Sequence, residues 1–260
     1  LMYHMSNKNR SQGFTIVELI VVISVLSILI GLIATTLLNF YLSNIATINR
    51  TTQANDVAST LQSIEKNVSL ASNFLSKTSG SALATPLGPE NSAMPWICKT
   101  GEPNYNVLIV QNYATDGTSS DTARKLIYSS PDCKSDPVKN TLIYFVDTSS
   151  TLYRRTISGP PSVCGGAISQ KTTRAPTATS SPLCIGVDAV LSRNVSKFQI
   201  HYFANSSDQT PVDPYSQSEV TAADTIRNAK AINITLETSE NINGKLNKYA
   251  STLRITRLNE

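Results

Sequence analysis

A long uncharged stretch near the N-terminus limits the folds open to this chain more than any other part of it. Residues 19–49 include no Asp, Glu, Lys or Arg, and apolar side chains are densest between 14 and 42. A helix of about 20 apolar residues can cross a bilayer, so the stretch predicts one transmembrane helix, over about 14–42. The residues before it are few and basic, Lys8 and Arg10. The positive-inside rule therefore predicts a cytoplasmic N-terminus, with the bulk of the chain outside.

One carboxylate lies at the start of this apolar region. Glu18 follows Gly13 by five residues and precedes the uncharged stretch directly. A carboxylate in a membrane helix costs roughly 2.5–3.5 kcal/mol on insertion scales, and such residues usually have a function and a partner. A cut after Gly13 would expose an amine on Phe14, whose positive charge is the obvious partner. An ordinary secretory signal is cut after its apolar core, whereas a cut here would leave the helix on the mature protein.

The string Gly13-Phe14-Thr15-Ile16-Val17-Glu18-Leu19 resembles the class III signal of type IV pilins and type II secretion pseudopilins. The resemblance implies that a prepilin peptidase removes residues 1–13 and that the new N-terminal residue, Phe14, becomes N-methylated. It assigns Glu18 to filament assembly rather than to acid–base catalysis. In a bundle of subunits, Glu18 would meet the Phe14 amine of a neighbour. Wrong registers would be disfavoured, because an unpaired buried charge costs several kcal/mol.

The helix is predicted to continue beyond the membrane, over 14–77. Apolar residues recur at spacings of four and three, which is a helical period: Val57, Leu61, Ile64, Val68, Ala71 and Leu75. We expect this stripe to pack on a β-sheet, with a coiled coil as the alternative. Many pilins carry Pro where this chain has Thr35 and Gly where it has Ser27; here only Gly31 weakens the helix.

Residues 78–260 predict a β-rich head outside the cytoplasm, so the fold class is α+β, with the second half of the long helix packed on an antiparallel sheet. Short runs rich in Val, Ile, Leu and Tyr, separated by turn residues, predict strands. They cover 105–113, 125–129, 141–147, 152–157, 195–204, 231–238 and 249–257, with a short helix at 222–229. The order of elements over 190–258 resembles that of J-type pseudopilins and larger minor pilins.

Four cysteines follow the apolar stretch, and their even number predicts disulfides in an oxidising compartment. Four cysteines allow three pairings. Pairing between sequence neighbours is preferred, Cys98 with Cys133 and Cys164 with Cys184, and four free buried thiols are the alternative. None of the four has a CxxC spacing and the chain has two histidines, so we expect neither a zinc site nor a cofactor.

These features predict a structural subunit, minor or large main, of a type IV pilus-like filament. No catalytic motif such as GxSxG or HExxH occurs, so we expect no enzyme. The expected partners are other pilin subunits, the prepilin peptidase and the inner-membrane assembly platform. Lys and Arg are scattered at a net charge of +4, without the basic stripe of a nucleic-acid protein. We expect a single-pass protein of the cytoplasmic membrane that later enters an extracellular or periplasmic filament. A type II secretion pseudopilin and a membrane-anchored adhesin that does not polymerise remain as alternatives.

Overall fold

The computed structural model describes most of the chain in two compact units, Leu1–Asn49 and Arg50–Glu260. Helix α1 (Ile16–Ser69) contributes residues to both units. The described residues are 15–77, 107–116, 125–160, 164, 168–176, 184–212, 219–242 and 244–258.

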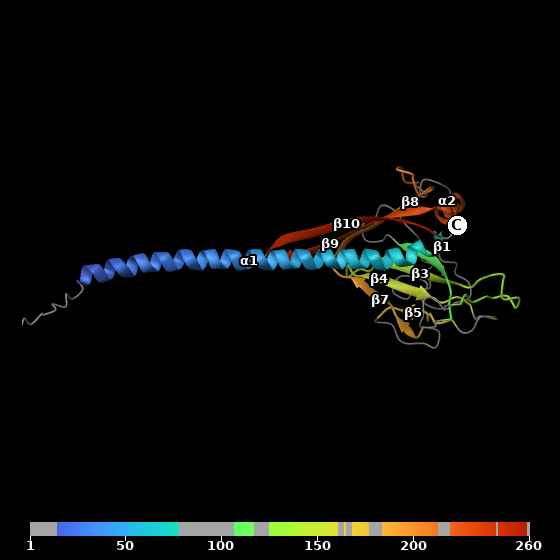
Figure 1. The fold of residues 1–260 in the computed structure, drawn as a ribbon, viewed down its shortest axis with the longest axis horizontal. Helices are drawn as coiled ribbons and strands as arrows, with labels where there is room; N and C mark the ends of the chain where they lie inside the picture. The colour runs from blue at the N-terminus through green and yellow to red at the C-terminus, as the bar shows by residue number, and fades with distance from the viewer. Residues whose placement is uncertain are drawn as a thin grey trace, which may run out of the picture. The chain divides into compact units, whose positions relative to one another are not determined.

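In the described part of the head the strand pairs are antiparallel apart from one short pair; Figure 1 labels most of these strands. A five-stranded sheet has the order β1-β2-β3-β4-β7, a three-stranded sheet has the order β10-β9-β8, and β5 pairs with β6 in parallel. A second helix, α2 (Glu219–Asn228), lies between β8 and β9 in the chain. The strands are β1 (Ala71–Leu75), β2 (Leu108–Tyr113), β3 (Lys139–Val146), β4 (Leu152–Ile157), β5 (Thr173–Arg174), β6 (Gly186–Val187), β7 (Ala189–Ser192), β8 (Val195–Phe203), β9 (Ala231–Ile242) and β10 (Lys245–Thr256). The predicted α+β class, with a long helix and an antiparallel head, is confirmed.

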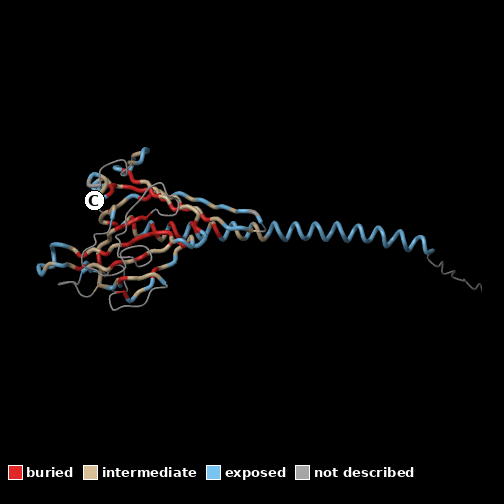
Figure 2. The backbone as a smooth tube through the Cα atoms, turned by 180° about the vertical axis from the view of Figure 1, so that it is seen from behind, coloured by how far each residue is buried: buried red, intermediate tan, exposed pale blue. Residues whose placement is uncertain are grey.

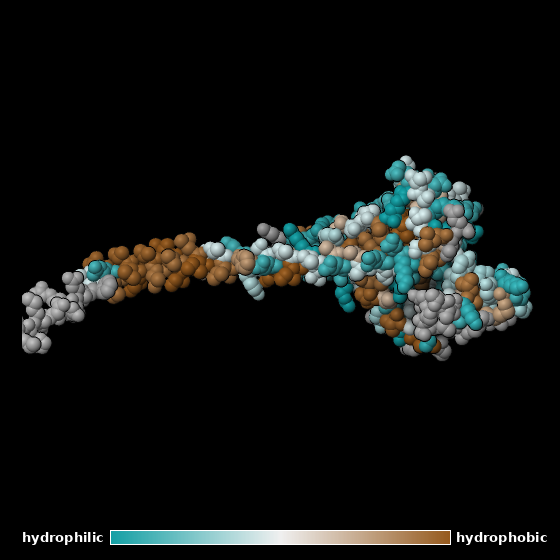
Figure 3. All heavy atoms as spheres, viewed as in Figure 1, coloured by the Kyte–Doolittle hydropathy of each residue, from teal (hydrophilic) through white to brown (hydrophobic). Residues whose placement is uncertain are grey.

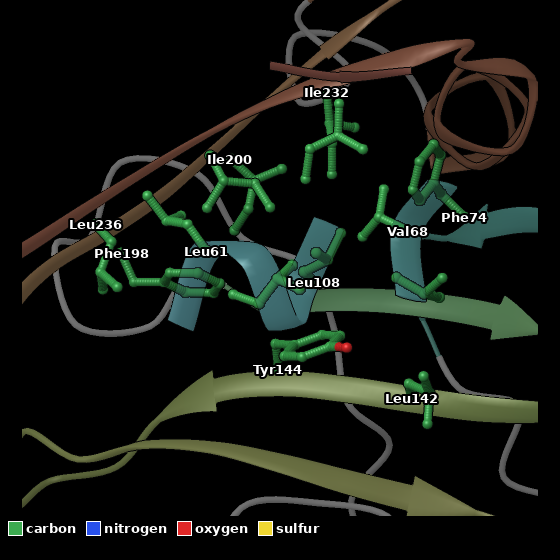
Figure 4. Close-up of a cluster of buried hydrophobic side chains, with 14 of the residues drawn as sticks. Leu61, Val68, Phe74, Leu108, Leu142, Tyr144, Phe198, Ile200, Ile232 and Leu236 are labelled. Carbon is green, nitrogen blue, oxygen red and sulfur yellow. The ribbon is translucent and has the colours of Figure 1, made fainter. Parts of the chain in front are cut away.

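The second half of α1 lies in the core between the two larger sheets (Figure 4). Its predicted stripe is buried: Val57, Leu61, Ile64 and Val68 are all at most 4% exposed. Each such aliphatic side chain contributes about 1.5–3 kcal/mol when fully buried. Figure 2 shows the buried backbone concentrated in the head. From the two sheets, the same cluster takes Leu108, Val110, Leu142, Tyr144, Val146, Leu152, Phe198, Ile200, Tyr202, Ile232, Ile234, Leu236 and Ile255. The stripe is therefore core packing, not a coiled-coil seam.

The helix ends at Ser69, so the prediction that it continues to residue 77 is wrong. Two of its last carbonyls are taken by distant parts of the chain: Leu258 N–H donates to Ser69 O at 2.8 Å, and Asn112 Nδ2 donates to Asn67 O at 3.0 Å. Terminal helix carbonyls need such partners. Ala71 and Leu75 continue the alternating three- and four-residue spacing of the stripe, but they belong to β1, which pairs with β2.

The three-stranded sheet is built around the longest hairpin of the head. Strands β9 and β10 stay in register from Ala231 opposite Thr256 to Ile242 opposite Lys245. The connection contains Gly244 at a φ of 77°, a conformation that glycine adopts without steric cost. The two strands are longer than the predicted runs, because their pairing continues as far as Ile242 opposite Lys245.

A buried ion pair fixes the corner where the chain passes from β6 into β7. The Arg155 and Asp188 side chains are both 0% exposed, and Arg155 Nη2 lies 2.6 Å from Asp188 Oδ2. Arg155 Nε also donates to both carboxylate oxygens, at 3.0 and 3.1 Å. The Thr173 hydroxyl donates to Asp188 Oδ1 at 2.7 Å. Strand β4 and the β5–β6 pair are thus joined through one carboxylate.

The disulfide joins Cys133 to Cys164, so the predicted pairs Cys98–Cys133 and Cys164–Cys184 are wrong. Tyr128 explains the pairing, because its backbone exchanges hydrogen bonds of 3.1 and 3.3 Å with that of Cys164. The turn that follows Tyr128 brings Cys133 back, to a Cα–Cα distance of 5.5 Å. That separation is ordinary for a disulfide. Cys184 is a buried free thiol, and Cys98 lies outside the described residues.

The same arrangement explains why 125–129 is not a strand. Leu126 and Tyr128 form isolated bridges only: Leu126 with Thr115, and Tyr128 with both Pro137 and Cys164. The partner changes from Thr115 at Leu126 to Pro137 and Cys164 at Tyr128, so no ladder of several residues runs along one neighbour.

Peptide mapping without reduction should recover Cys133 linked to Cys164. Cys184 is 1% exposed, so we expect it to react with an alkylating reagent only after the head is unfolded. Mass spectrometry of the digested protein checks both statements. A peptide that links Cys98 to Cys133, or Cys164 to Cys184, would contradict the pairing.

Alkaline pH should destabilise the head through one phenol. Burial raises the pKa of Tyr144 to about 12, whereas an exposed tyrosine has a pKa of about 10. The unfolded chain therefore ionises at Tyr144 first, and stability present below pH 10 is lost as the pH rises toward 12. We expect Tyr144 to account for a loss of about 1 kcal/mol between pH 9 and pH 11. Denaturation of wild type and Tyr144→Phe at both values isolates this contribution, and an equal pH dependence in both would contradict it.

Candidate functional site

The N-terminal end of α1 is closed by a reciprocal pair of side chains. Thr15 donates to Glu18 Oε2 twice, from its backbone N–H and from its hydroxyl, both at 3.0 Å. In return, Glu18 N–H donates to Thr15 Oγ1 at 3.3 Å. This is a capping box, in which a threonine and a glutamate three residues apart satisfy the free N–H groups of a helix start. The carboxylate is therefore held in place by its own chain.

The capping geometry leaves one carboxylate oxygen for another donor. Both bonds that the Glu18 carboxylate accepts in the described part of the chain end on Oε2. An ionised carboxylate has about four lone-pair sites on two oxygens. A cation from another molecule can therefore approach Oε1 without displacing Thr15.

The part of α1 that belongs to the first unit, up to Asn49, exposes apolar side chains around most of its circumference. In Figure 3 the face in view is mostly brown over the N-terminal part of α1, apart from teal atoms at its start. Its large aliphatic residues are exposed, among them Ile16 at 78%, Ile28 at 66% and Leu32 at 63%. The helix is long and apolar enough to cross a membrane. A helix that is hydrophobic all round needs lipid or other helices around it.

The few hydroxyls in this segment are satisfied within the helix. Ser24 and Ser27 donate to the carbonyls of Ile20 and Ile23, both at 2.8 Å. Thr36 donates to Leu32 O at 2.8 Å, and Thr35 makes bonds of 2.9 and 3.1 Å to the preceding turn. No hydroxyl among these four therefore meets lipid unpaired, which would be costly.

Helix α1 is continuous around Gly31, the position at which the sequence predicts a weakened helix. Residues 31 and 35 both lie inside α1, and a Cβ on Gly31 would have no atom within 4 Å. Gly31 therefore faces open space rather than a close neighbour.

The structure describes Glu18 but not the other two predicted site residues, since Gly13 and Phe14 lie outside the described residues. It adds Thr15, whose part in the helix start was not predicted from the sequence. The signal was present as the spacing Thr15-Ile16-Val17-Glu18, a Thr-x-x-Glu capping box before an apolar run. Among the residues described, no group of three or more His, Cys, Asp or Glu side chains could hold a metal ion.

Residues 8–34 match the family profile of the prokaryotic N-terminal methylation motif, the class III signal of type IV pilins and pseudopilins. The match covers the basic N-terminal segment, the predicted cleavage position, the capping box and the first part of α1, and it does not extend to the head. No curated protein matches the chain. The N-terminal segment is thus that of a pilin-like precursor, a structural class of protein.

Proposed function

We propose that the chain is a structural subunit, minor or large main, of a type IV pilus-like filament. It is cut after Gly13 by a prepilin peptidase, methylated on Phe14 and assembled through α1 at an inner-membrane platform. Before assembly the helix holds the protein in the cytoplasmic membrane with its head outside. After assembly the subunit is part of an extracellular or periplasmic filament.

The observation that carries this proposal is the position of Glu18. It is the last charge before the apolar segment, inside the region that matches the methylation motif. A carboxylate there costs roughly 2.5–3.5 kcal/mol in a bilayer, and Thr15 relieves only part of that cost because it supplies no charge.

The missing charge is the amine that cleavage would create. N-methylation keeps that ammonium positive, so an incoming subunit can place Glu18 Oε1 against the Phe14 amine of its neighbour. The ion pair neutralises two poorly solvated charges together, and a subunit shifted along the axis leaves both uncompensated. The charge pair thereby selects the register, while the aliphatic surface of α1 supplies cohesion without direction.

The mass of the mature N-terminus tests the proposal. Protein isolated from cells should begin at Phe14 and carry one methyl group on its amine. N-terminal peptide mass spectrometry measures both modifications. A mature pool that retains residues 1–13 would refute it, because no new amine would then exist to pair with Glu18.

A pseudopilin of a type II secretion system is the second candidate. The order β8, α2, β9, β10 follows the order expected from the resemblance to J-type pseudopilins. Both candidates require the same cleavage and the same carboxylate. Shearing of cells separates them: a displayed filament releases the subunit into the sheared fraction, whereas a periplasmic pseudopilus keeps it with the cells.

A further inference from the structure

An open cleft lies at one end of β2 and β3. It has a volume of about 470 Å³, within the range of sites that hold small molecules. Strand β2 contributes Gln111 and Tyr113, and Val138 and Lys139 line it at the start of β3. The remaining lining residues come from the preceding loop and from the end of β4: Ser129, Asp136, Pro137 and Pro160.

The loop wall of the cleft is cross-linked into place. Ser129 donates to Asp136 O from its N–H at 3.0 Å and from its hydroxyl at 2.9 Å. The Cys133–Cys164 disulfide holds the turn between them. Most residues of this turn are exposed, so these bonds fix the shape of a surface rather than build core.

The opposite wall depends on a close backbone approach. A Cβ on Gly159 would lie 2.4 Å from Val138 Cγ1 and 2.6 Å from Lys139 O, so only glycine fits there. Gly159 N–H donates to Asn140 Oδ1 at 2.9 Å, which sets the position of Pro160 beside the cleft. Both walls are therefore fixed before any ligand arrives, which lowers the cost of binding.

Two opposite charges line this cleft without neutralising each other. Lys139 Nζ lies 5.6 Å from the centre of the Tyr113 ring, a cation–π distance. Within the described ranges, neither Lys139 nor the Asp136 carboxylate has an ion-pair partner. Gln111 adds an amide that both donates and accepts. The cleft thus offers donors and acceptors side by side.

We infer that this cleft binds a neutral saccharide. Asp136 disfavours an anion and Lys139 disfavours a cation, whereas a sugar hydroxyl both donates and accepts. Neighbouring hydroxyls of one ring can therefore satisfy the carboxylate and the ammonium together. The rings of Pro137 and Pro160, which line the cleft, give apolar surface to the C–H face of the sugar. This activity is separate from filament assembly and does not depend on it.

Saturation-transfer NMR on the full chain, in a detergent without a sugar head group, tests the inference. The probes are maltose, lactose and diacetylchitobiose, with glucuronate and inorganic phosphate for comparison. We expect at least one disaccharide to bind and neither anion to bind more tightly. Asp136→Asn and Lys139→Met should each weaken that binding at least tenfold. Asn tolerates the left-handed backbone of Asp136, whose φ is 51°. The matched control is Lys134→Met, in the same loop but not in the cleft, which should leave binding unchanged.

Three results would overturn the inference: no disaccharide binds, binding survives both cleft substitutions, or phosphate binds best and depends on Lys139. The Cys133–Cys164 cross-link and the denaturation midpoint report whether each variant is folded. Filament incorporation of Asp136→Asn and Lys139→Met should equal that of wild type, so a failure of saccharide binding is distinct from a failure of assembly.

Discussion

Glu18→Ala should abolish incorporation into filaments while the head folds and the helix enters the membrane. Removal of the carboxylate from the incoming subunit leaves the Phe14 ammonium of its neighbour buried without a counter-charge, which costs several kcal/mol. Each 1.4 kcal/mol is a factor of ten in an equilibrium, so we expect incorporation to fall at least a hundredfold. Membrane insertion should not suffer, since the substitution removes a cost of roughly 2.5–3.5 kcal/mol. Immunoblots of sheared filaments and of membranes measure the two quantities separately.

Glu18→Gln separates the charge from the helix cap. The amide oxygen of Gln can still accept from Thr15 and keep the capping box, but it cannot neutralise an ammonium. We expect Glu18→Gln to fail as Glu18→Ala does. Thr15→Val keeps the charge and removes the capping hydroxyl, at a cost of about 1 kcal/mol, so it should incorporate at a reduced level. Normal filaments from Glu18→Gln would show that the cap alone matters and that the ion-pair mechanism is wrong.

The second large effect concerns the buried pair of the head. Asp188→Asn should lower the free energy of unfolding by about 3–5 kcal/mol, because it leaves the Arg155 guanidinium buried without its counter-charge. Asn keeps the shape of Asp, so the loss reports the charge rather than a cavity. Chemical denaturation of the oxidised protein measures the change. Replacement of both partners by apolar residues, Arg155→Met with Asp188→Leu, should recover much of the loss, since a buried pair often contributes little net stability.

An exposed pair in the same head is the matched control. Lys248 Nζ lies 3.0 Å from Glu237 Oε1, with side chains 55% and 21% exposed. Hydrogen bonds from Ser196 and Lys248 lower the pKa of Glu237, so the carboxylate is ionised at neutral pH. Lys248→Met should nevertheless cost at most about 1 kcal/mol, as surface pairs do. A cost equal to that of Asp188→Asn would mean that burial does not set the difference.

Local pattern predicts well where local geometry decides the structure. The spacing of Val57, Leu61, Ile64 and Val68 identifies the buried face of α1 because a helix repeats every 3.6 residues. The strands of the larger sheets were mostly visible as apolar runs. The Thr-x-x-Glu capping box is also a local signal, although it was not among the predictions.

The errors arise where partners far along the chain decide the outcome. Helix α1 ends at Ser69, whose carbonyl accepts a hydrogen bond from the Leu258 N–H. Because that donor lies far along the chain, the residues near Ser69 do not predict the helix end. Cys133 pairs with Cys164 because Tyr128 bridges to Cys164, whereas proximity in sequence favoured other pairs. The corner at Asp188 likewise depends on Arg155, which is 33 positions away.

The Cys133–Cys164 bond also determines how the head responds to pulling. It closes a segment with a sequence separation of 31, and β3 and β4 lie wholly inside that segment. Tension applied to the two chain ends passes through the sulfur bridge and bypasses these strands. About 100 Å of chain, at 3.3–3.6 Å per extended residue, is thereby withheld from stretching. Under tension, a subunit can therefore lose its outer strands and still keep β3 and β4 of its five-stranded sheet.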